Sequence, residues 1–157
     1  MGKLGGFLEY ERKDPGYRPV RERLQDYRAV EQVLPGDELN RQAARCMNCG
    51  IPFCHGSGCP LGNVIPEFNH AAYLGEWENA LNILLSTSSF PEFTARICPA
   101  PCETACTLEL SNGQPVAIRQ IEHAVIEYGF ENGLIQPRPP ERRTGRRVAV
   151  VGAGPAG

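Results

Sequence analysis

Seven cysteines fall within two short stretches of the chain, and they constrain the fold more than any other feature. Residues 46–60 read CMNCGIPFCHGSGCP, and residues 98–106 read CPAPCETAC. Cysteines this dense form either disulfides or a metal site, and an odd number leaves one thiol outside any set of disulfides. The charged N-terminal residues resemble neither a signal peptide nor a membrane anchor, so we expect a cytoplasmic protein. Cytosolic thiols stay reduced, and the pattern therefore favours metal binding.

Composition limits the size of the fold and the kind of partner. The chain has 157 residues, of which 41% are hydrophobic, and this is enough for about one domain. Its formal net charge of −2 gives no overall basic surface of the kind that marks nucleic-acid binding. We expect protein or small-molecule partners, with no nucleic acid and no membrane.

Zinc is one metal that the cysteines could bind. Cys46-x-x-Cys49 has the spacing of a zinc knuckle, and a structural zinc site needs four thiolate or imidazole ligands. The three histidines of the chain could complete such sites: His55, His70 and His123. None of them has ligand spacing to a CxxC pair, so we predict that they are solvated or lie beside ligand residues.

Iron–sulfur chemistry accounts for more of the pattern. Cys46, Cys49 and Cys54 share a loop rich in glycine and proline, whose backbone can wrap a cubane and offer N–H groups to its sulfides. Cys59-Pro60 is similar to the last cysteine of the bacterial ferredoxin run, which binds the other cluster in two-cluster proteins. Two clusters need eight ligands, whereas the chain has seven cysteines. Either one cluster is incomplete, or a residue of another type supplies the eighth ligand.

Hydrophobic periodicity predicts an all-α fold. The clearest stripe lies within residues 75–87 and indicates a core helix: Trp77, Ala80, Leu81, Leu84 and Leu85. Further helices are expected over residues 21–34, over 36–45 with Asp37 as its cap, over 63–75 with Asn63 as its cap, and from about Pro115 onward.

The last predicted helix carries a carboxylate on its apolar side. Its stripe consists of Ile118, Ile121, Val125 and Ile126. Glu122 falls within this stripe, and burying an unpaired carboxylate is costly enough that the group should be paired, neutralised or bound to a metal. A salt bridge to Arg119 or Arg96 and the ligation of a metal are equally open on these grounds.

The composition changes after Gly133. Residues 137–146 are rich in proline and arginine and predict an extended linker. An apolar run then precedes Gly152-x-Gly154-x-x-Gly157, the opening of a dinucleotide-binding βαβ unit. We expect residues 147–157 to be the truncated start of a Rossmann-type FAD-binding domain, with a first strand and a glycine turn. Because no helix follows to complete the phosphate site, this chain alone should bind neither FAD nor NADPH.

Several blocks of the sequence resemble the N-terminal iron–sulfur domain of the glutamate synthase small (beta) subunit. The similarity covers nearly the whole chain and rests on GFLEYER, RPVRERLQDYRAV, QAARCMNCGIPFCHGSGCPLGNVIPEFN, FPEFTARICPAPCETACTL and PVAIRQIE. The same domain type is similar to the N-terminal part of dihydropyrimidine dehydrogenase and of electron-bifurcating flavoproteins.

This resemblance implies an all-helical, ferredoxin-like domain over residues 1–136 that binds two 4Fe-4S clusters. The first cluster would be held by Cys46, Cys49, Cys54 and Cys106. The second would be held by Cys59, Cys98, Cys102 and Glu122. Dihydropyrimidine dehydrogenase has a glutamine at the position of Glu122, so the two proteins differ in residue type there.

The resemblance also implies a role in electron transfer for glutamate biosynthesis. NADPH would reduce FAD on C-terminal domains of the same protein, and electrons would reach the large (alpha) subunit, where glutamine and 2-oxoglutarate give glutamate. The oxidoreductase activity would belong to the full-length protein, with no catalytic residue in this chain. Three alternatives stay open: a related NAD(P)H-dependent flavoprotein, a structural module that docks subunits, and a zinc-binding scaffold.

Overall fold

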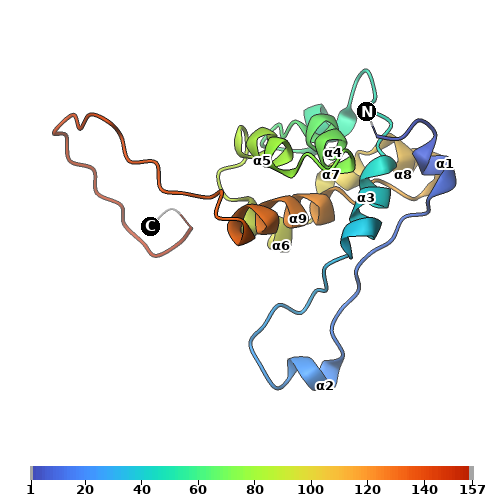
Figure 1. The fold of residues 1–157 in the computed structure, drawn as a ribbon, viewed down its shortest axis with the longest axis horizontal. Helices are drawn as coiled ribbons and strands as arrows, with labels where there is room; N and C mark the ends of the chain where they lie inside the picture. The colour runs from blue at the N-terminus through green and yellow to red at the C-terminus, as the bar shows by residue number, and fades with distance from the viewer. Residues whose placement is uncertain (1, 156–157) are drawn as a thin grey trace.

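The computed structural model describes residues 2–155. Short helices pack into one body, and two segments extend from it: the one that carries α2 and the chain after α9 (Figure 1). The α-helices are α1 (Gly6–Glu9), α2 (Val20–Arg23), α3 (Gly36–Ala44), α4 (Ile65–Tyr73), α5 (Trp77–Leu85), α6 (Pro91–Ile97), α7 (Pro101–Thr104), α8 (Thr107–Asn112) and α9 (Ile118–Glu131), with one π-helical turn, η1 (Cys54–Gly58). Within residues 2–155 there is no β-strand, only an isolated bridge between Tyr17 and Glu31. The prediction of an all-α fold is confirmed.

The core lies where α4, α5 and α9 pack together. Phe68 of α4, Leu84 of α5 and Val125 of α9 are each fully buried, at 0% exposure. The predicted core helix over residues 75–87 is confirmed as α5, although it is shorter, and its Trp77 ring stacks on Tyr128 of α9. Because α3 and α6 also pack on this group, the segments that carry the cysteines attach to a fixed scaffold.

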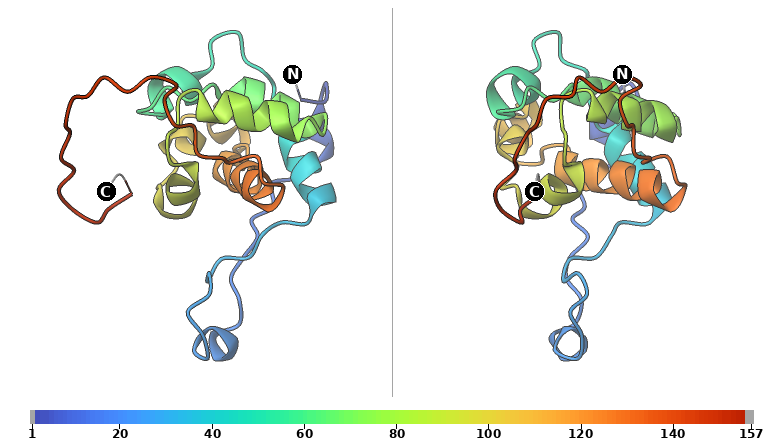
Figure 2. Two further views of the ribbon diagram at one scale, coloured as in Figure 1. Left: turned by 60° about the vertical axis from the view of Figure 1, so that its left-hand side comes forward. Right: turned by 90° about the vertical axis from the view of Figure 1, so that its left-hand side faces the viewer.

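The predicted helix over residues 21–34 is wrong. Only the four residues of α2 are helical, and residues 13–33 form an arm that extends from the body with α2 at its tip (Figures 1 and 2). The arm turns back on itself, and the Arg18 N–H donates a hydrogen bond to the Val30 carbonyl at 2.9 Å. Its apolar side chains include exposed ones: Val20, Leu24 and Tyr27. A helix this short is marginal without a buried face, so the rest of the segment is irregular.

Both predicted caps are also wrong. Asp37 lies inside the first turn of α3, where an acidic side chain still suits the helix dipole, and it makes no capping hydrogen bond. The Asn63 side chain does not cap α4, because it is hydrogen-bonded to Glu122 and Thr87 instead. The helix predicted to start near Pro115 begins at Ile118.

The chain after α9 forms the second extended segment, which leads away from the helical body (Figure 2). Residues 137–155 are exposed and contain neither helix nor strand. The strand predicted within residues 147–157 is therefore not formed here, since a strand needs a neighbour to pair with. Gly152 has a φ of +123°, a backbone region that favours glycine, and Gly157 lies outside the described residues. None of the described helices has the length and apolar character that would span a bilayer.

Candidate metal centre

The structure distributes the cysteines between two separate pockets. The first pocket is lined by four of them: Cys46, Cys49, Cys54 and Cys106. Three of these belong to the loop that follows α3 and ends in η1, whereas Cys106 lies between α7 and α8. Loop and helix junction are far apart in the sequence, so the fold is what brings these four thiols together.

The second pocket is lined by the other members of the predicted site. They are Cys59, Cys98, Cys102 and Glu122. Cys59 follows η1, Cys98 and Cys102 flank the start of α7, and Glu122 reaches the pocket from α9. Within residues 2–155, no three His, Cys, Asp or Glu side chains gather as they would around a single metal ion. The cysteines are all free, with no disulfide.

Burial and mutual proximity oppose ionisation of the first set of thiols. Burial raises the pKa of Cys54 to about 12, and the neighbouring thiols of Cys106 and Cys46 add to the effect. Burial also raises the pKa of Cys46, although hydrogen bonds from the Asn48 backbone and the Asn69 side chain act in the opposite direction. A metal cation deprotonates coordinating thiols, so this pocket suits a cationic cofactor that accepts several sulfur ligands at once.

Glu122 lies in the second pocket, which Arg119 also lines, and it forms no ion pair among the residues that the structure describes. It is 7% exposed, and Asn63 Nδ2 donates a hydrogen bond to its Oε1 at 2.9 Å. Burial raises the pKa of Glu122 to about 7, and the Asn63 hydrogen bond partly offsets this shift. Burial and the Glu122 and Glu103 carboxylates raise the pKa of Cys102 in turn.

Within residues 2–155, Glu122 does not form the predicted alternative, a salt bridge to Arg119 or Arg96. Arg119 pairs instead with Glu31 of the arm at 2.6 Å, and Arg96 pairs with Glu127 at 2.7 Å. Both arginines have acceptors of their own, so the Glu122 side chain is left to line the second pocket together with its three cysteines and Arg119. A buried carboxylate in that position fits a ligand better than an ion-pair partner.

The backbone around the cysteines takes conformations that ordinary residues rarely adopt. Asn48 and Ala100 have φ values of +50° and +55°, and each lies between two cysteines of its own stretch. The Ala100 N–H donates to Cys98 Sγ at 3.4 Å. Strained backbone of this kind concentrates at functional sites, and N–H donors to sulfur are one means of tuning an iron–sulfur centre.

Some residues at the site were not foreseen from the sequence. Asn63 and Asn69 contact the two pockets through side-chain amides, a role that no spacing rule signals. The histidines His55, His70 and His123 do not line either pocket. His123 is 6% exposed, so it is not solvated, and it lies directly after Glu122, as the other half of the prediction allowed. Burial lowers its pKa.

Comparison with known proteins gives this arrangement a family. Residues 23–134 match the family model described as dihydropyrimidine dehydrogenase domain II, 4Fe-4S cluster. Over its full length the chain is 54% identical to the glutamate synthase (NADPH) small chain of Mycobacterium tuberculosis and 50% identical to that of Bacillus subtilis. Both matches include 100% of this chain but only 32% and 33% of the length of those two proteins. It is also 49% identical to the glutamate synthase (NADH) of Schizosaccharomyces pombe over 100% of this chain and 7% of that protein.

The chain therefore spans about a third of the length of the bacterial relatives, which are 54% and 50% identical to it. The family match includes both cysteine stretches, Glu122 and the helices that connect them. With its thiols held in two pockets by these same helices, the chain belongs to the 4Fe-4S cluster family of dihydropyrimidine dehydrogenase domain II.

Proposed function

We propose that the chain is the electron-transfer domain of a glutamate synthase small (beta) subunit and that it holds two 4Fe-4S clusters. The observation that carries the proposal is the division of eight donor side chains between two pockets, four in each. The glutamate synthase relatives support the enzyme, and the family model supports the kind of cofactor. In the full-length protein the domain would relay electrons from NADPH and FAD to the large (alpha) subunit in the cytoplasm.

The donors fit the group. The first cluster would be held by Cys46, Cys49, Cys54 and Cys106, and the second by Cys59, Cys98, Cys102 and Glu122. A bound cluster supplies a site that accepts and releases one electron, and the chain sets its potential through burial, hydrogen bonds to sulfur and nearby charge. Asn69 and the Asn48 amide would perform this for Cys46, and the Ala100 amide for Cys98.

The remainder of the chain would connect the domain to the flavin. Residues 137–146 are proposed as the linker between the helical domain, 1–136, and the dinucleotide-binding domain that begins at 147–157. Gly152 and Gly154 would form part of the FAD turn there. A related NAD(P)H-dependent flavoprotein is the second candidate, because the family model takes its name from dihydropyrimidine dehydrogenase.

Metal analysis tests the proposal directly. Anaerobically purified chain should contain about eight iron and about eight acid-labile sulfide per molecule, which corresponds to two cubanes. Dithionite should reduce these clusters and produce an electron paramagnetic resonance (EPR) signal. Stoichiometric zinc without sulfide would instead establish a zinc scaffold, and iron that cannot be reduced would establish a structural module.

Iron should also change the conformation of the first loop. The first pocket encloses about 20 Å³ and the second about 210 Å³, so a cluster in the first would need a wider pocket. Residues 47–52, which include part of its lining, belong to no helix or strand and are the part of the wall best able to move. Because metal binding and folding are coupled, amide exchange within residues 46–60 should slow markedly on iron loading, whereas α5 should change little. Equal protection with and without iron would contradict this expectation.

A further inference from the structure

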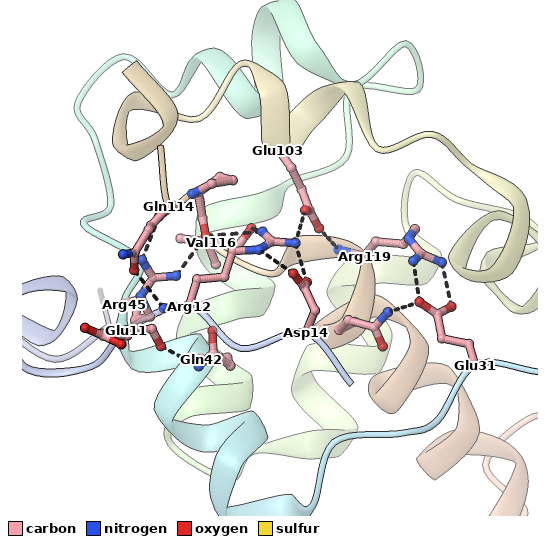
Figure 3. Close-up of polar contacts among 12 residues, drawn as sticks. Glu11, Arg12, Asp14, Glu31, Gln42, Arg45, Glu103, Gln114, Val116 and Arg119 are labelled. Atoms are coloured by element: carbon pink, nitrogen blue, oxygen red, sulfur yellow. Dashed lines mark hydrogen bonds and ion pairs between the residues drawn. The ribbon is translucent and has the colours of Figure 1, made fainter. Parts of the chain in front are cut away.

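Arg45 is a fully buried cation that comes directly before the first cysteine. Its side chain is 0% exposed, and all of its nearest acceptors are backbone carbonyls (Figure 3). Nε donates to Tyr10 O at 3.0 Å, Nη1 to Pro115 O at 2.8 Å and Nη2 to Gln114 O at 2.6 Å. These bonds use three of the five N–H donors of the guanidinium, but a carbonyl does not neutralise its charge.

Within residues 2–155, Arg45 forms no ion pair with a carboxylate. The other two arginines drawn in Figure 3 each form one. Arg12 pairs with Glu103 at 2.7 Å, and Arg119 pairs with Glu31. Burying a charge costs several kcal/mol unless an opposite charge compensates for it, and a guanidinium does not escape by losing its proton. The position of Arg45 therefore calls for a negative group that is not a carboxylate.

The thiols of the first pocket would become such a group on binding a metal, which deprotonates coordinating thiols. Cys46 follows Arg45 in the chain. Burial and the nearby charge of Arg12 lower the pKa of Arg45, whereas Cys106 opposes that shift. Arg45 donates hydrogen bonds to the carbonyls of residues 114 and 115, and the next residue, Val116, lines the first pocket. The guanidinium is thus buried and fixed to the segment that leads into the wall of the first pocket.

We propose that Arg45 is the fixed counter-charge of the first cluster and that it raises the reduction potential of this cluster. The inference rests on the proposed function, because it needs a cluster on Cys46, Cys49, Cys54 and Cys106. Reduction adds one electron to a centre that four thiolates already make negative, and no bond forms or breaks. A nearby cation stabilises the reduced form more than the oxidised form, and low dielectric strengthens the effect.

Arg45→Gln removes this charge and keeps a hydrogen-bonding side chain. In the anaerobically reconstituted chain, an EPR-monitored redox titration should show at least a tenfold loss in the reduction equilibrium constant of the first cluster, about 59 mV for one electron. The second cluster should titrate as in the unchanged chain. Arg45→Lys keeps the charge while losing the planar fork, so its shift should be much smaller.

A purely structural arginine predicts a different result. Arg45→Gln and Arg45→Lys would then lose iron to the same extent, and any cluster that remained would keep its potential. The matched control is Arg12→Gln combined with Asp14→Asn, which removes contacts to the same loop, together with the Arg12–Glu103 pair, and leaves the net charge unchanged. These side chains are more exposed, so the double variant should change the equilibrium constant by at most about twofold.

Gln114→Glu tests the proposal even if the Arg45 variants fail to fold. This residue is half-buried, its own carbonyl binds Arg45, and a carboxylate there would oppose the guanidinium charge. We expect the first potential to fall, as in Arg45→Gln. An unchanged potential in Gln114→Glu and in every Arg45 variant that folds would overturn the inference. Absence of any cluster signal in the unchanged chain would overturn the proposed function and the inference with it.

Discussion

Replacing Glu122 with alanine is expected to remove the second cluster or convert it to a three-iron form, while the first cluster stays intact. Of the four ligands proposed for the second cluster, three are thiols and the fourth is this carboxylate. Alanine therefore leaves one iron without a protein ligand. Iron should fall from about eight per chain to about seven or about four, depending on whether the cluster is converted or lost. Iron analysis and EPR spectroscopy measure this directly.

Two further changes at the same position define the role of the side chain. Glu122→Gln keeps an oxygen donor without its charge, so the second cluster should remain and its potential should rise. Glu122→Cys supplies a thiolate and should also retain the cluster, with a changed potential. Glu127→Ala is the matched control, since Glu127 lies on the same helix and pairs with Arg96 near the surface.

The outcome that contradicts ligation is also specific. If Glu122 is only a buried carboxyl, alanine would leave Asn63 Nδ2 without its acceptor and lower the free energy of unfolding by about 1–3 kcal/mol. Both clusters would then keep their iron and their spectra whenever the protein is folded. Thermal unfolding and iron content, measured on the same sample, separate the two roles.

The parts of the fold that periodicity predicted are those in which an apolar stripe is buried. Leu81 and Leu84 are 2% and 0% exposed, because helical spacing places them on one side of α5. The same rule placed Glu122 on the buried side of α9, where the structure has it. Burial of a face is a local property of the sequence, so a single helix reveals it.

The arm and the short helices depended on contacts that a local pattern does not contain. Residues 21–34 include acceptable helix formers. In the structure, however, Glu31 forms an ion pair with Arg119 of α9, and Asp26 forms one with Arg18. α7 and α8 are too short to show a period. Tertiary partners therefore overrode propensity in these segments.

The candidate site shows the same division. Spacing indicated iron–sulfur chemistry, but the assignment of Cys106 to the first set and Cys98 to the second came from the resemblance alone. Arg45 carried no signal in the sequence, because its partners are backbone carbonyls of residues 10, 114 and 115. Carbonyls have no residue type, so only the fold reveals such a partner.

Gly58 lies where the two cysteine stretches touch. A Cβ atom at this position would be 2.7 Å from Cys102 Cα and 2.9 Å from Ala105 Cβ. Neither atom is the end of a flexible side chain, so η1 and α7 would have to separate. Gly58 does not have a positive φ, and the requirement is therefore for space rather than for conformational freedom.

We expect Gly58→Ala to lose iron from both pockets. Cys54 and Cys59 lie on either side of Gly58 and line different pockets, so a displaced η1 moves a donor in each. Overpacking of this kind lowers the free energy of unfolding by about 1–3 kcal/mol, and iron should fall well below the level of the unchanged chain.

The matched control is Gly56→Ala in the same turn. Gly56 is exposed, and a Cβ atom there would meet nothing within 4 Å. This variant should keep its iron and its thermal stability, because it adds the same methyl group to the same turn without a close contact. If Gly58→Ala held iron as well as Gly56→Ala does, the two pockets would not depend on the packing of η1 against α7. Their donors would then have to be held by the helices on either side, and the close approach at Gly58 would matter for stability alone.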